Sequence, residues 1–337
     1  MKKYLLTRQE LSQLLDRLAK ETNLYAPVKD KTGATWGKVK NAAEVHLEEV
    51  NTREPAKGFI FPRCEVLLRF DQKGNALEPE PPAEQIVFGI RPCDARAIAF
   101  LEKFYTIEGK TDPYVKARRE KRTFIGLACN RTAPTCFCLA LGGSPHDATG
   151  MDLLLTDLGD LFLAEPLTAK GEKLIAGYPE AKDEHLTAGA KLREKADAEI
   201  PLRIDTAKLQ EVLPKAFASK IWETLALNCV NCGACTFLCP TCHCFDVTDE
   251  TVRGSTVRCR VWDSCQFTLY SRHASGHNPR LDPRARYRNR VMDKFYYTVE
   301  QAGVISCVGC GRCIIACPAN IDIRTTVERL LKEFPEE

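Results

Sequence analysis

The chain has 337 residues, of which 44% are hydrophobic and 28% are charged, and its formal net charge is +3. This length allows two domains, and the composition excludes a disordered or fibrous protein. No run of about 18 apolar residues is present to span a membrane. Met1-Lys2-Lys3-Tyr4-Leu5-Leu6 is followed at once by the polar residues Thr7-Arg8-Gln9-Glu10. The apolar core of a signal peptide is therefore missing, and we expect a cytoplasmic protein without a membrane span.

Two apolar runs and a helical pattern indicate the fold of the first part. Residues 9–20 place four leucines on one helical face, which predicts an amphipathic helix. Residues 85–90 and 123–128 are apolar runs of strand length, and residues 94–104 between them have a helical pattern. A strand–helix–strand unit with parallel strands follows, so the first domain is predicted to be α/β. Neither of the common glycine-rich nucleotide-binding motifs is present.

A cysteine follows each of these two strands. The carboxyl ends of parallel neighbours meet at one edge of a sheet, where ligands bind, so Cys93 and Cys129 are expected to lie close together. Cys93 would also begin a helix, whose dipole favours a thiolate. With Cys136 and Cys138 they make either a four-thiolate metal site, which is counted below as the third [4Fe–4S] site, or a group of buried structural thiols. The residues alone leave both interpretations open. Cys64 has no partner nearby and is interpreted as a plain thiol.

Cysteine is the unusual component of this chain. Seventeen cysteines are present, with none in residues 139–228 and twelve between Cys229 and Cys317. A disulfide framework is not expected in a chain that is neither short nor secreted, so metal ligation is the favoured interpretation. Within the cysteine-free stretch, the charged segment 180–199 is predicted to be a connecting helix. We place the domain boundary near residue 210, with an α/β domain at 1–210 and a second domain at 211–337.

The second domain contains two copies of one cysteine motif. Cys229-x2-Cys232-x2-Cys235-x3-Cys239-Pro and Cys307-x2-Cys310-x2-Cys313-x3-Cys317-Pro have the spacing of two-cluster ferredoxins, in which the fourth cysteine of each motif ligates the other cluster. The spacing predicts a [4Fe–4S] cluster on Cys229, Cys232, Cys235 and Cys317. It predicts a second cluster on Cys307, Cys310, Cys313 and Cys239. Zinc is the alternative, but zinc sites usually use two thiolate pairs.

Residues 240–306 separate the two motifs. A helical pattern at 284–297 predicts a mainly α-helical two-cluster ferredoxin domain with an insertion. The remaining Cys242, Cys244, Cys259 and Cys265 form either a fourth metal site or, as we favour, neighbours packed around the clusters.

Residues 251–294 are strongly basic. They hold nine Arg and one Lys against three Asp, which indicates a solvated helical face or a docking surface for an acidic partner. Nucleic acid is not expected as a partner, because the basic residues are not accompanied by a nucleic-acid-binding motif in which aromatic residues alternate with the basic ones.

Seven motifs together resemble a known family. They are Ile90-Arg-Pro-Cys-Asp94, Thr135-Cys-Phe-Cys138, Cys239-Pro-Thr-Cys-His-Cys-Phe245, Trp262-Asp-Ser-Cys265, His277-Asn-Pro-Arg280, Arg286-Tyr-Arg-Asn-Arg290 and Cys307-Val-Gly-Cys-Gly-Arg-Cys313. From about residue 55 to 325 the chain resembles the iron–sulfur β subunit of cytoplasmic sulfhydrogenase-type NiFe hydrogenases. It equally resembles the related A subunit of anaerobic sulfite reductase. His243 departs from the pattern, because an aromatic residue is expected there.

The resemblance implies a complex. It implies that the third cluster, on Cys93, Cys129, Cys136 and Cys138, is present. It also implies a partner subunit that carries FAD or FMN and exchanges electrons with NAD(P)H, and a catalytic partner that is a NiFe hydrogenase, a sulfite reductase or another redox enzyme.

The expected function is one-electron transfer. No general acid–base pair or activated nucleophile is apparent in the sequence, so we expect a non-catalytic electron-transfer subunit of an anaerobic oxidoreductase complex. Two alternatives are a flavin- or cluster-dependent reductase and a redox-sensing binding protein.

Overall fold

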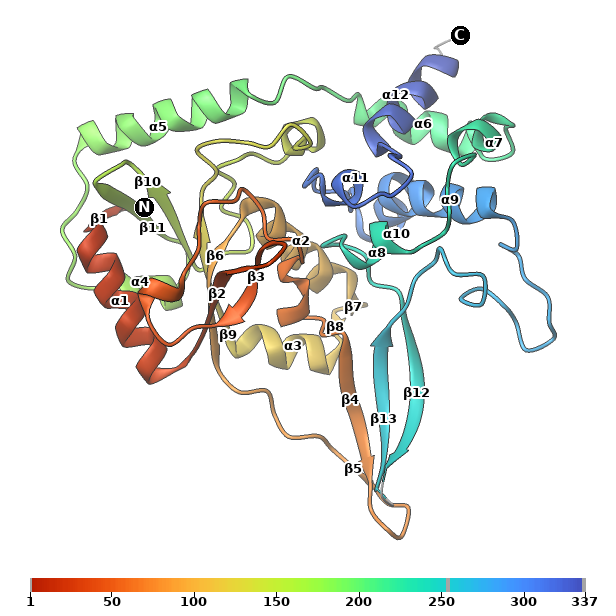
Figure 1. Cartoon of the computed structure of the whole chain (residues 1–337), viewed down its shortest axis with the longest axis horizontal. Helices are drawn as coiled ribbons and strands as arrows, with labels where there is room; N and C mark the ends of the chain where they lie inside the picture. Colours follow the sequence, from red (N-terminus) through yellow and green to blue (C-terminus); the bar gives the residue numbers. More distant parts are fainter. Residues whose placement is uncertain (1, 253–254, 335–337) are drawn as a thin grey trace.

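A seven-stranded mixed sheet forms the centre of the N-terminal part of the computed structural model, which describes residues 2–252 and 255–334 (Figure 1). The strand order is β1-β11-β10-β9-β6-β2-β3. These strands are β1 Tyr4–Thr7, β2 Asn23–Asp30, β3 Gly33–Lys38, β6 Gln85–Ile90, β9 Arg122–Leu127, β10 Leu153–Asp157 and β11 Leu161–Pro166. The central strands β10, β9, β6 and β2 are parallel neighbours, so their carboxyl ends share one edge.

Helices cover both faces of this sheet. They are α1 Arg8–Glu21, α2 Pro92–Phe104, α3 Pro113–Glu120 and α4 Ala169–Ile175. The buried leucines of α1 and Ile175 of α4 pack on one face, while α2 and α3 pack on the other. A capping box between Thr7 and Glu10 begins α1 by satisfying backbone N–H groups that have no partner within the helix. The predicted helix at 9–20 and the predicted parallel unit β6–α2–β9 are confirmed.

A long helix connects the sheet to the C-terminal helices. Helix α5, Asp183–Ala198, runs along the top of the molecule in Figure 1 toward α6, Thr206–Ala216. The helix predicted at 180–199 is therefore confirmed. Helix α6 buries Leu209, Val212 and Leu213 in the same core as the C-terminal helices. The division of the chain near residue 210 stays a prediction.

The C-terminal part is built mainly of helices. They are α7 Ile221–Leu225, α8 Ala234–Phe237, α9 Pro283–Met292, α10 Thr298–Ala302, α11 Arg312–Ile315 and α12 Ile323–Glu333. A π-helical segment, Asp293–Tyr297, joins α9 to α10, which confirms the helix predicted at 284–297. In the part of the chain that the structure describes, no helix combines the length and apolar character needed to cross a membrane.

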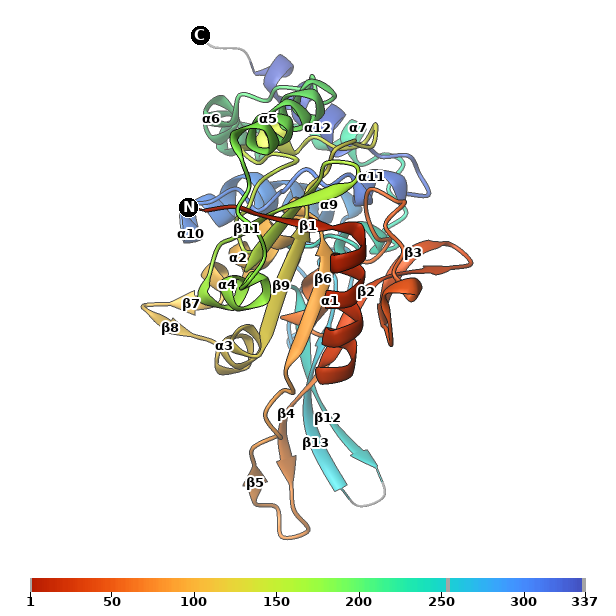
Figure 2. The same ribbon diagram turned by 90° about the vertical axis from the view of Figure 1, so that its left-hand side faces the viewer.

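A second sheet projects from the body as an arm (Figures 1 and 2). Its order is β12-β13-β4-β5, with β12 Phe245–Val252, β13 Ser255–Trp262, β4 Cys64–Phe70 and β5 Ala76–Leu77. The sequence analysis did not predict this sheet, and it expected a mainly helical segment between the two motifs. Strand β4 pairs antiparallel with β13, so the arm joins the first and last thirds of the chain. The remaining elements are the hairpin β7 Thr106–Ile107 and β8 Lys110–Thr111, and 3₁₀ helices at Ala42–Glu44, Ala56–Phe59 and Cys138–Leu141.

A buried ion pair ties the two parts together. The Arg312 guanidinium in α11 donates to both carboxylate oxygens of Asp94 in α2, at 2.6 and 2.7 Å. Both side chains are at least 96% buried, with 4% and 1% exposure. Arg312 Nε also donates to the carbonyl oxygen of Thr52 at 2.8 Å. A buried charge of this kind is stable only while its partner is present.

The substitution Asp94→Asn tests this dependence. It leaves the Arg312 charge buried without its carboxylate, so we expect the free energy of unfolding to fall by about 3–5 kcal/mol. Urea denaturation under anaerobic conditions measures this loss. The matched control is Asp249→Asn, because Asp249 pairs with Arg258 on the exposed arm, and an exposed pair contributes little. Equal losses in the two variants would contradict the role given to the buried pair.

Candidate metal centres

The two cysteine motifs adopt the same local backbone. In each, a glycine in the left-handed conformation lies between the second and third cysteines, Gly233 with φ 75° and Gly311 with φ 76°. A one-turn helix follows each glycine, α8 in the first motif and α11 in the second, and these two helices pack against each other. Glycine is required because other residues adopt this conformation only with strain. The sequence repeat therefore becomes a structural repeat.

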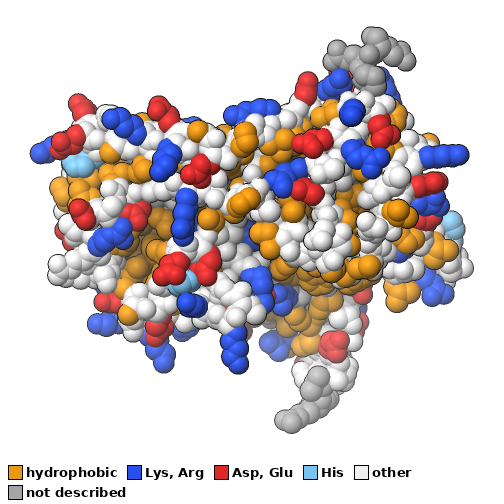
Figure 3. All heavy atoms as spheres, turned by 45° about the horizontal axis from the view of Figure 1, so that its top comes forward, with side chains coloured by type: hydrophobic (Ala, Val, Ile, Leu, Met, Phe, Trp, Pro, Cys, Tyr) orange, Lys and Arg blue, Asp and Glu red, His pale blue; other side chains and the backbone are white. Residues whose placement is uncertain are grey.

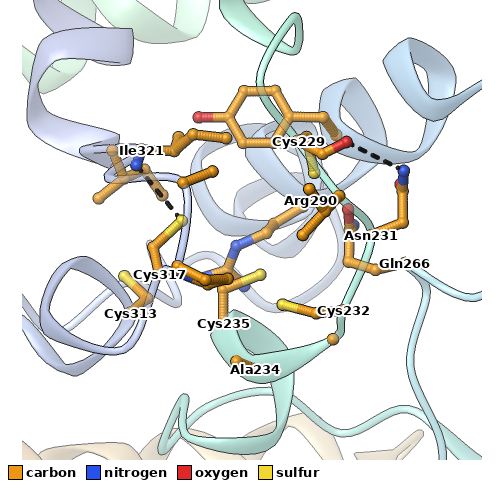
Figure 4. Close-up of a pocket in the computed structure, with 16 residues that line it drawn as sticks. Cys229, Asn231, Cys232, Ala234, Cys235, Gln266, Arg290, Cys313, Cys317 and Ile321 are labelled. Atoms are coloured by element: carbon orange, nitrogen blue, oxygen red, sulfur yellow. Dashed lines mark hydrogen bonds between the residues drawn. The ribbon is translucent and has the colours of Figure 1, made fainter.

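The first motif and the end of the second enclose one pocket, the first cysteine pocket (Figure 4). Its lining includes all four cysteines predicted for the first cluster, Cys229, Cys232, Cys235 and Cys317. Tyr287, Arg290 and Gln266 line the same space. The backbone N–H of Ile321 donates to Cys317 Sγ at 3.3 Å, and Asn231 Nδ2 donates to the carbonyl oxygen of Cys229 at 3.3 Å. These bonds fix the two ends of the loop.

The second motif encloses a second cysteine pocket. Its lining includes the predicted set of Cys239, Cys307, Cys310 and Cys313, together with two cations, Arg290 and Lys294. The crossing of the fourth cysteines is thus seen in the structure, because Cys239 from the first motif lies with the second motif and Cys317 lies with the first. Cys313 and Arg290 line both pockets, so the two pockets are neighbours.

A third cysteine pocket lies at the carboxyl edge of the large sheet. Its lining includes Cys93, Cys129, Cys136 and Cys138, which are the four residues of the third predicted set. Cys93 lies in the first turn of α2, directly after β6, and Cys129 lies just after β9. The expectation that parallel strands bring these two thiols together is confirmed. Ligation by any of the three sets stays a prediction.

The chemistry of the side chains fits iron–sulfur clusters. None of the seventeen cysteines is in a disulfide. A zinc ion needs its thiolates within about 2.3 Å of one point, and no group of three or more His, Cys, Asp or Glu in the described residues is arranged to hold a single metal ion. A cubane spreads its four thiolates around a larger body. All-cysteine pockets flanked by left-handed glycines therefore suit [4Fe–4S] clusters.

Burial controls the protonation of these thiols. It raises the pKa of Cys129 and of Cys310 to about 11, and the pKa of Cys138 and of Cys307 to about 12. The free thiols are therefore protonated near pH 7, and metal binding must displace their protons. The pKa of Cys239 instead lies well below its usual value, because the Cys242 thiol hydrogen-bonds to it and Lys294 and Arg290 attract the thiolate, which together outweigh burial.

Buried cations lie beside the first and second pockets, and the basic composition of residues 251–294 did not single them out. Arg286, Arg290 and Lys294 follow one another at intervals of four residues, and all are at least 96% buried, with exposures of 4%, 3% and 1%. Residues four apart share one helix face, so this spacing was the available signal. A further buried cation is Lys57, whose Nζ donates to the carbonyl oxygen of Cys242 at 2.9 Å and lies 4.0 Å from the centre of the Trp262 ring.

Cys242, Cys244 and Cys265 pack near these pockets. The favoured packing around the clusters is wrong for Cys259, which lies on β13 of the arm beside Cys64 of β4. Arg290 Nη1 donates to Cys242 Sγ at 3.4 Å, and the Cys244 and Cys265 thiols hydrogen-bond to each other. Cys64, interpreted as a plain thiol, is exposed on β4.

His243, the departure from the family pattern, lies between aromatic rings. Its ring centre is 3.8 Å from that of Phe104. Burial lowers the pKa of His243, so the ring is neutral near pH 7 and contributes packing rather than charge.

The second and third pockets touch through their backbones. The backbone N–H of Phe137 donates to the carbonyl oxygen of Gly309 at 2.9 Å. A Cβ added to Gly309 would lie 2.5 Å from the backbone N of Cys138. Gly309 and Cys310 line both pockets, so the third pocket adjoins the second.

Comparisons with known proteins agree with this geometry. A family model described as a 4Fe-4S dicluster domain matches residues 228–321. The subunit named sulfhydrogenase 2 subunit beta, from Pyrococcus furiosus, is 31% identical over 315 residues, which cover 92% of each chain. No solved structure matches the chain.

The substitution Gly309→Ala tests the contact between the second and third pockets. The added methyl group would force the two loops apart, since its close neighbours are backbone atoms, and we expect a lower melting temperature. Gly109→Ala is the control: Gly109 also has a positive φ, 76° against 66°, but no atom within 4 Å of an added Cβ. The control therefore carries only the conformational strain of about 1–2 kcal/mol. If both variants melt at the same temperature, the close contact is absent.

Proposed function

The chain belongs to the family of sulfhydrogenase beta subunits, and from this premise we propose that it carries three [4Fe–4S] clusters in an electron-transfer complex. The observation that carries the proposal is the convergence of twelve cysteines, four at a time, on three adjoining pockets. The first pocket would hold its cluster with Cys229, Cys232, Cys235 and Cys317. The second would use Cys307, Cys310, Cys313 and Cys239, and the third Cys93, Cys129, Cys136 and Cys138.

The order of the pockets supports a linear relay. Cys313 lines the first and second pockets, and Cys310 lines the second and third. The second pocket is therefore the middle of the row. When bound, each cluster stores one electron, so three in a row can accept a two-electron equivalent one electron at a time. We propose that electrons enter at one end of this row and leave at the other.

Charged side chains of the protein would adjust the reduction potentials of the clusters in this row. Arg290 lines the first and second pockets, and Lys294 lines the second. A thiolate-ligated cluster is negatively charged and becomes more so on reduction, so nearby buried cations stabilise the reduced form. Among the described residues, Arg290 has no salt bridge to a carboxylate, which leaves its charge available to the cluster.

The family premise supports two kinds of partner. We propose that one partner is a subunit that carries FAD or FMN and exchanges electrons with NAD(P)H, and that the other is a catalytic subunit of the hydrogenase or sulfite reductase kind. We also propose that the chain itself is not the catalytic subunit and that it works in the cytoplasm. The third cluster would belong to residues 1–210 and the other two to residues 211–337.

Iron counting tests the number of clusters. Protein purified anaerobically should contain about twelve Fe per chain, four for each cluster. The substitution Cys138→Ser should remove one cluster and leave about eight Fe. Cys64→Ser is the control, because Cys64 lies outside all three cysteine pockets, and it should leave about twelve. A wild-type content of about eight Fe would remove the third cluster from the proposal, and zinc in place of iron would refute the proposal altogether.

A redox titration tests the role of the buried charge. Removing the Arg290 charge with Arg290→Gln should move the midpoint potential of the adjoining clusters to more negative values, because the reduced state loses its stabilising charge. Electron paramagnetic resonance at controlled potentials measures the shift.

The matched control is Arg288→Gln, which removes an arginine from the same helix. Arg288 lies over the Phe217 ring, 3.9 Å from its centre, and lines none of the three cysteine pockets. We expect its titration to match that of the wild type. Equal shifts of the midpoint potential in the two variants would mean that any loss of positive charge causes the shift, and that the buried position of Arg290 does not matter.

A further inference from the structure

The three cysteine pockets differ in how far they reach the surface. Of the twelve cysteines that line them, all within the described residues, Cys232 is the one that is exposed. It belongs to the first pocket, at one end of the row. At the other end, all four cysteines of the third pocket are at least partly buried. We call the end of the row at the first pocket, where a pocket cysteine is itself exposed, the open end.

Large apolar side chains lie exposed on the two segments that flank this open end, residues 227–233 and 264–281, and we call them the apolar rim. The rim consists of Leu227, Val230, Phe267, Leu269 and Leu281, with exposures of 78%, 65%, 37%, 71% and 66%. Val230 lines the first pocket directly, and Leu227 lies two residues before Cys229. Exposed apolar groups gathered at one place mark an interaction site more often than isolated ones.

The loop of residues 264–281 carries three members of the rim and is held against the first motif. Arg286 makes one connection, since its Nη1 donates to the carbonyl oxygen of Leu281 at 2.6 Å and its Nε to Asn231 Oδ1 at 3.3 Å. Phe267 makes another, because a Cβ on Gly233 would lie 2.8 Å from its ring. Figure 1 shows this loop projecting at the right of the molecule, and Figure 3 shows hydrophobic side chains beside a histidine side chain at its right-hand edge.

The same loop is basic. Residues 264–281 include two Arg and two His but no Asp or Glu. Arg272 is exposed, and neither it nor Arg280 forms a salt bridge within the described residues. The surface thus combines an apolar rim with positive charge that has no partner inside the chain.

We propose that the apolar rim and the basic loop form the docking surface for an acidic redox protein whose own cofactor lies near its surface. This inference rests on the proposed function, because it takes the first pocket to hold a cluster. Apolar contact would exclude water around Cys232, and the positive charge would orient an acidic partner and speed its encounter. The open end of the row is where such a partner approaches the first pocket most closely.

Hydrogen exchange in the native complex tests the location. Amide exchange is compared between the isolated chain and the anaerobically purified complex from the native host. We expect residues 227–233 and 264–281 to exchange at least about tenfold more slowly in the complex. Unchanged exchange in both segments would overturn the docking surface.

Matched variants test the energetics. Leu269→Asp places a charge in the rim, and Ile107→Asp places one at a residue of equal exposure, 72% against 71%, in the hairpin β7–β8. We expect Leu269→Asp to weaken the complex at least about tenfold, equivalent to about 1.4 kcal/mol, and Ile107→Asp to leave it unchanged. Native mass spectrometry of the complex against dilution measures the fraction assembled. Equal assembly of both variants would overturn the proposal.

The iron content of the same samples separates this inference from the proposed function. Loss of assembly with about twelve Fe retained supports the docking surface. Full assembly of Leu269→Asp with about twelve Fe overturns the docking surface and leaves the relay intact. A wild-type chain without iron would overturn the relay and, with it, the inference.

Discussion

The buried pair of Arg312 and Asp94 is the interaction on which the arrangement of the pockets depends. Asp94 directly follows Cys93 of the third pocket, and Arg312 lies between Cys310 and Cys313 of the second. The bidentate bond therefore sets the separation of two pockets whose cysteines come from opposite ends of the chain. Asn51 adds a second connection, since its Nδ2 donates to the Cys310 carbonyl oxygen at 3.3 Å and Cys93 Sγ donates to its Oδ1 at 3.6 Å. Separating Arg312 from Asp94 would leave a buried charge without its partner, which costs much free energy. The pair therefore holds the second and third pockets in one fixed relative position.

The proposed cluster explains why positively charged side chains are buried around the second pocket. Lys57, Arg290 and Lys294 are all at least 97% buried, and among the residues that the structure describes only Lys294 of the three has a carboxylate partner, Asp293 at 3.1 Å. Burying unpaired cations is strongly unfavourable unless negative charge lies close by. Four thiolates around a cluster supply such charge, whereas in the free protein Cys307, Cys310 and Cys313 have raised pKa values and stay protonated near pH 7. The cations are thus better explained by an occupied pocket than by packing alone.

Local sequence patterns predicted the individual helices and strands of this fold. They did not predict which distant strands pair with each other. The leucines of residues 9–20 and the run 85–90 specify their own helix and strand through periodicity. The three cysteine sets were also predictable, because motif spacing and the shared edge of parallel strands are local rules. By contrast, β4 pairs with β13 across more than half the length of the chain, and the buried Arg260–Glu65 contact that accompanies it spans 195 residues. Nothing in the sequence near β13 indicates which distant strand it joins.

The insertion between the two motifs adds buried positive charge beyond that of the cysteine motifs themselves. A compact two-cluster ferredoxin needs only the two loops and their short helices, here α8 and α11. Residues 240–306 add the continuous helix that carries Arg286, Arg290 and Lys294 on one face, and this face lies against the first and second pockets. The same insertion continues outward into the basic loop beside Cys232. One segment therefore carries both the buried cations beside the first and second pockets and the basic loop beside Cys232.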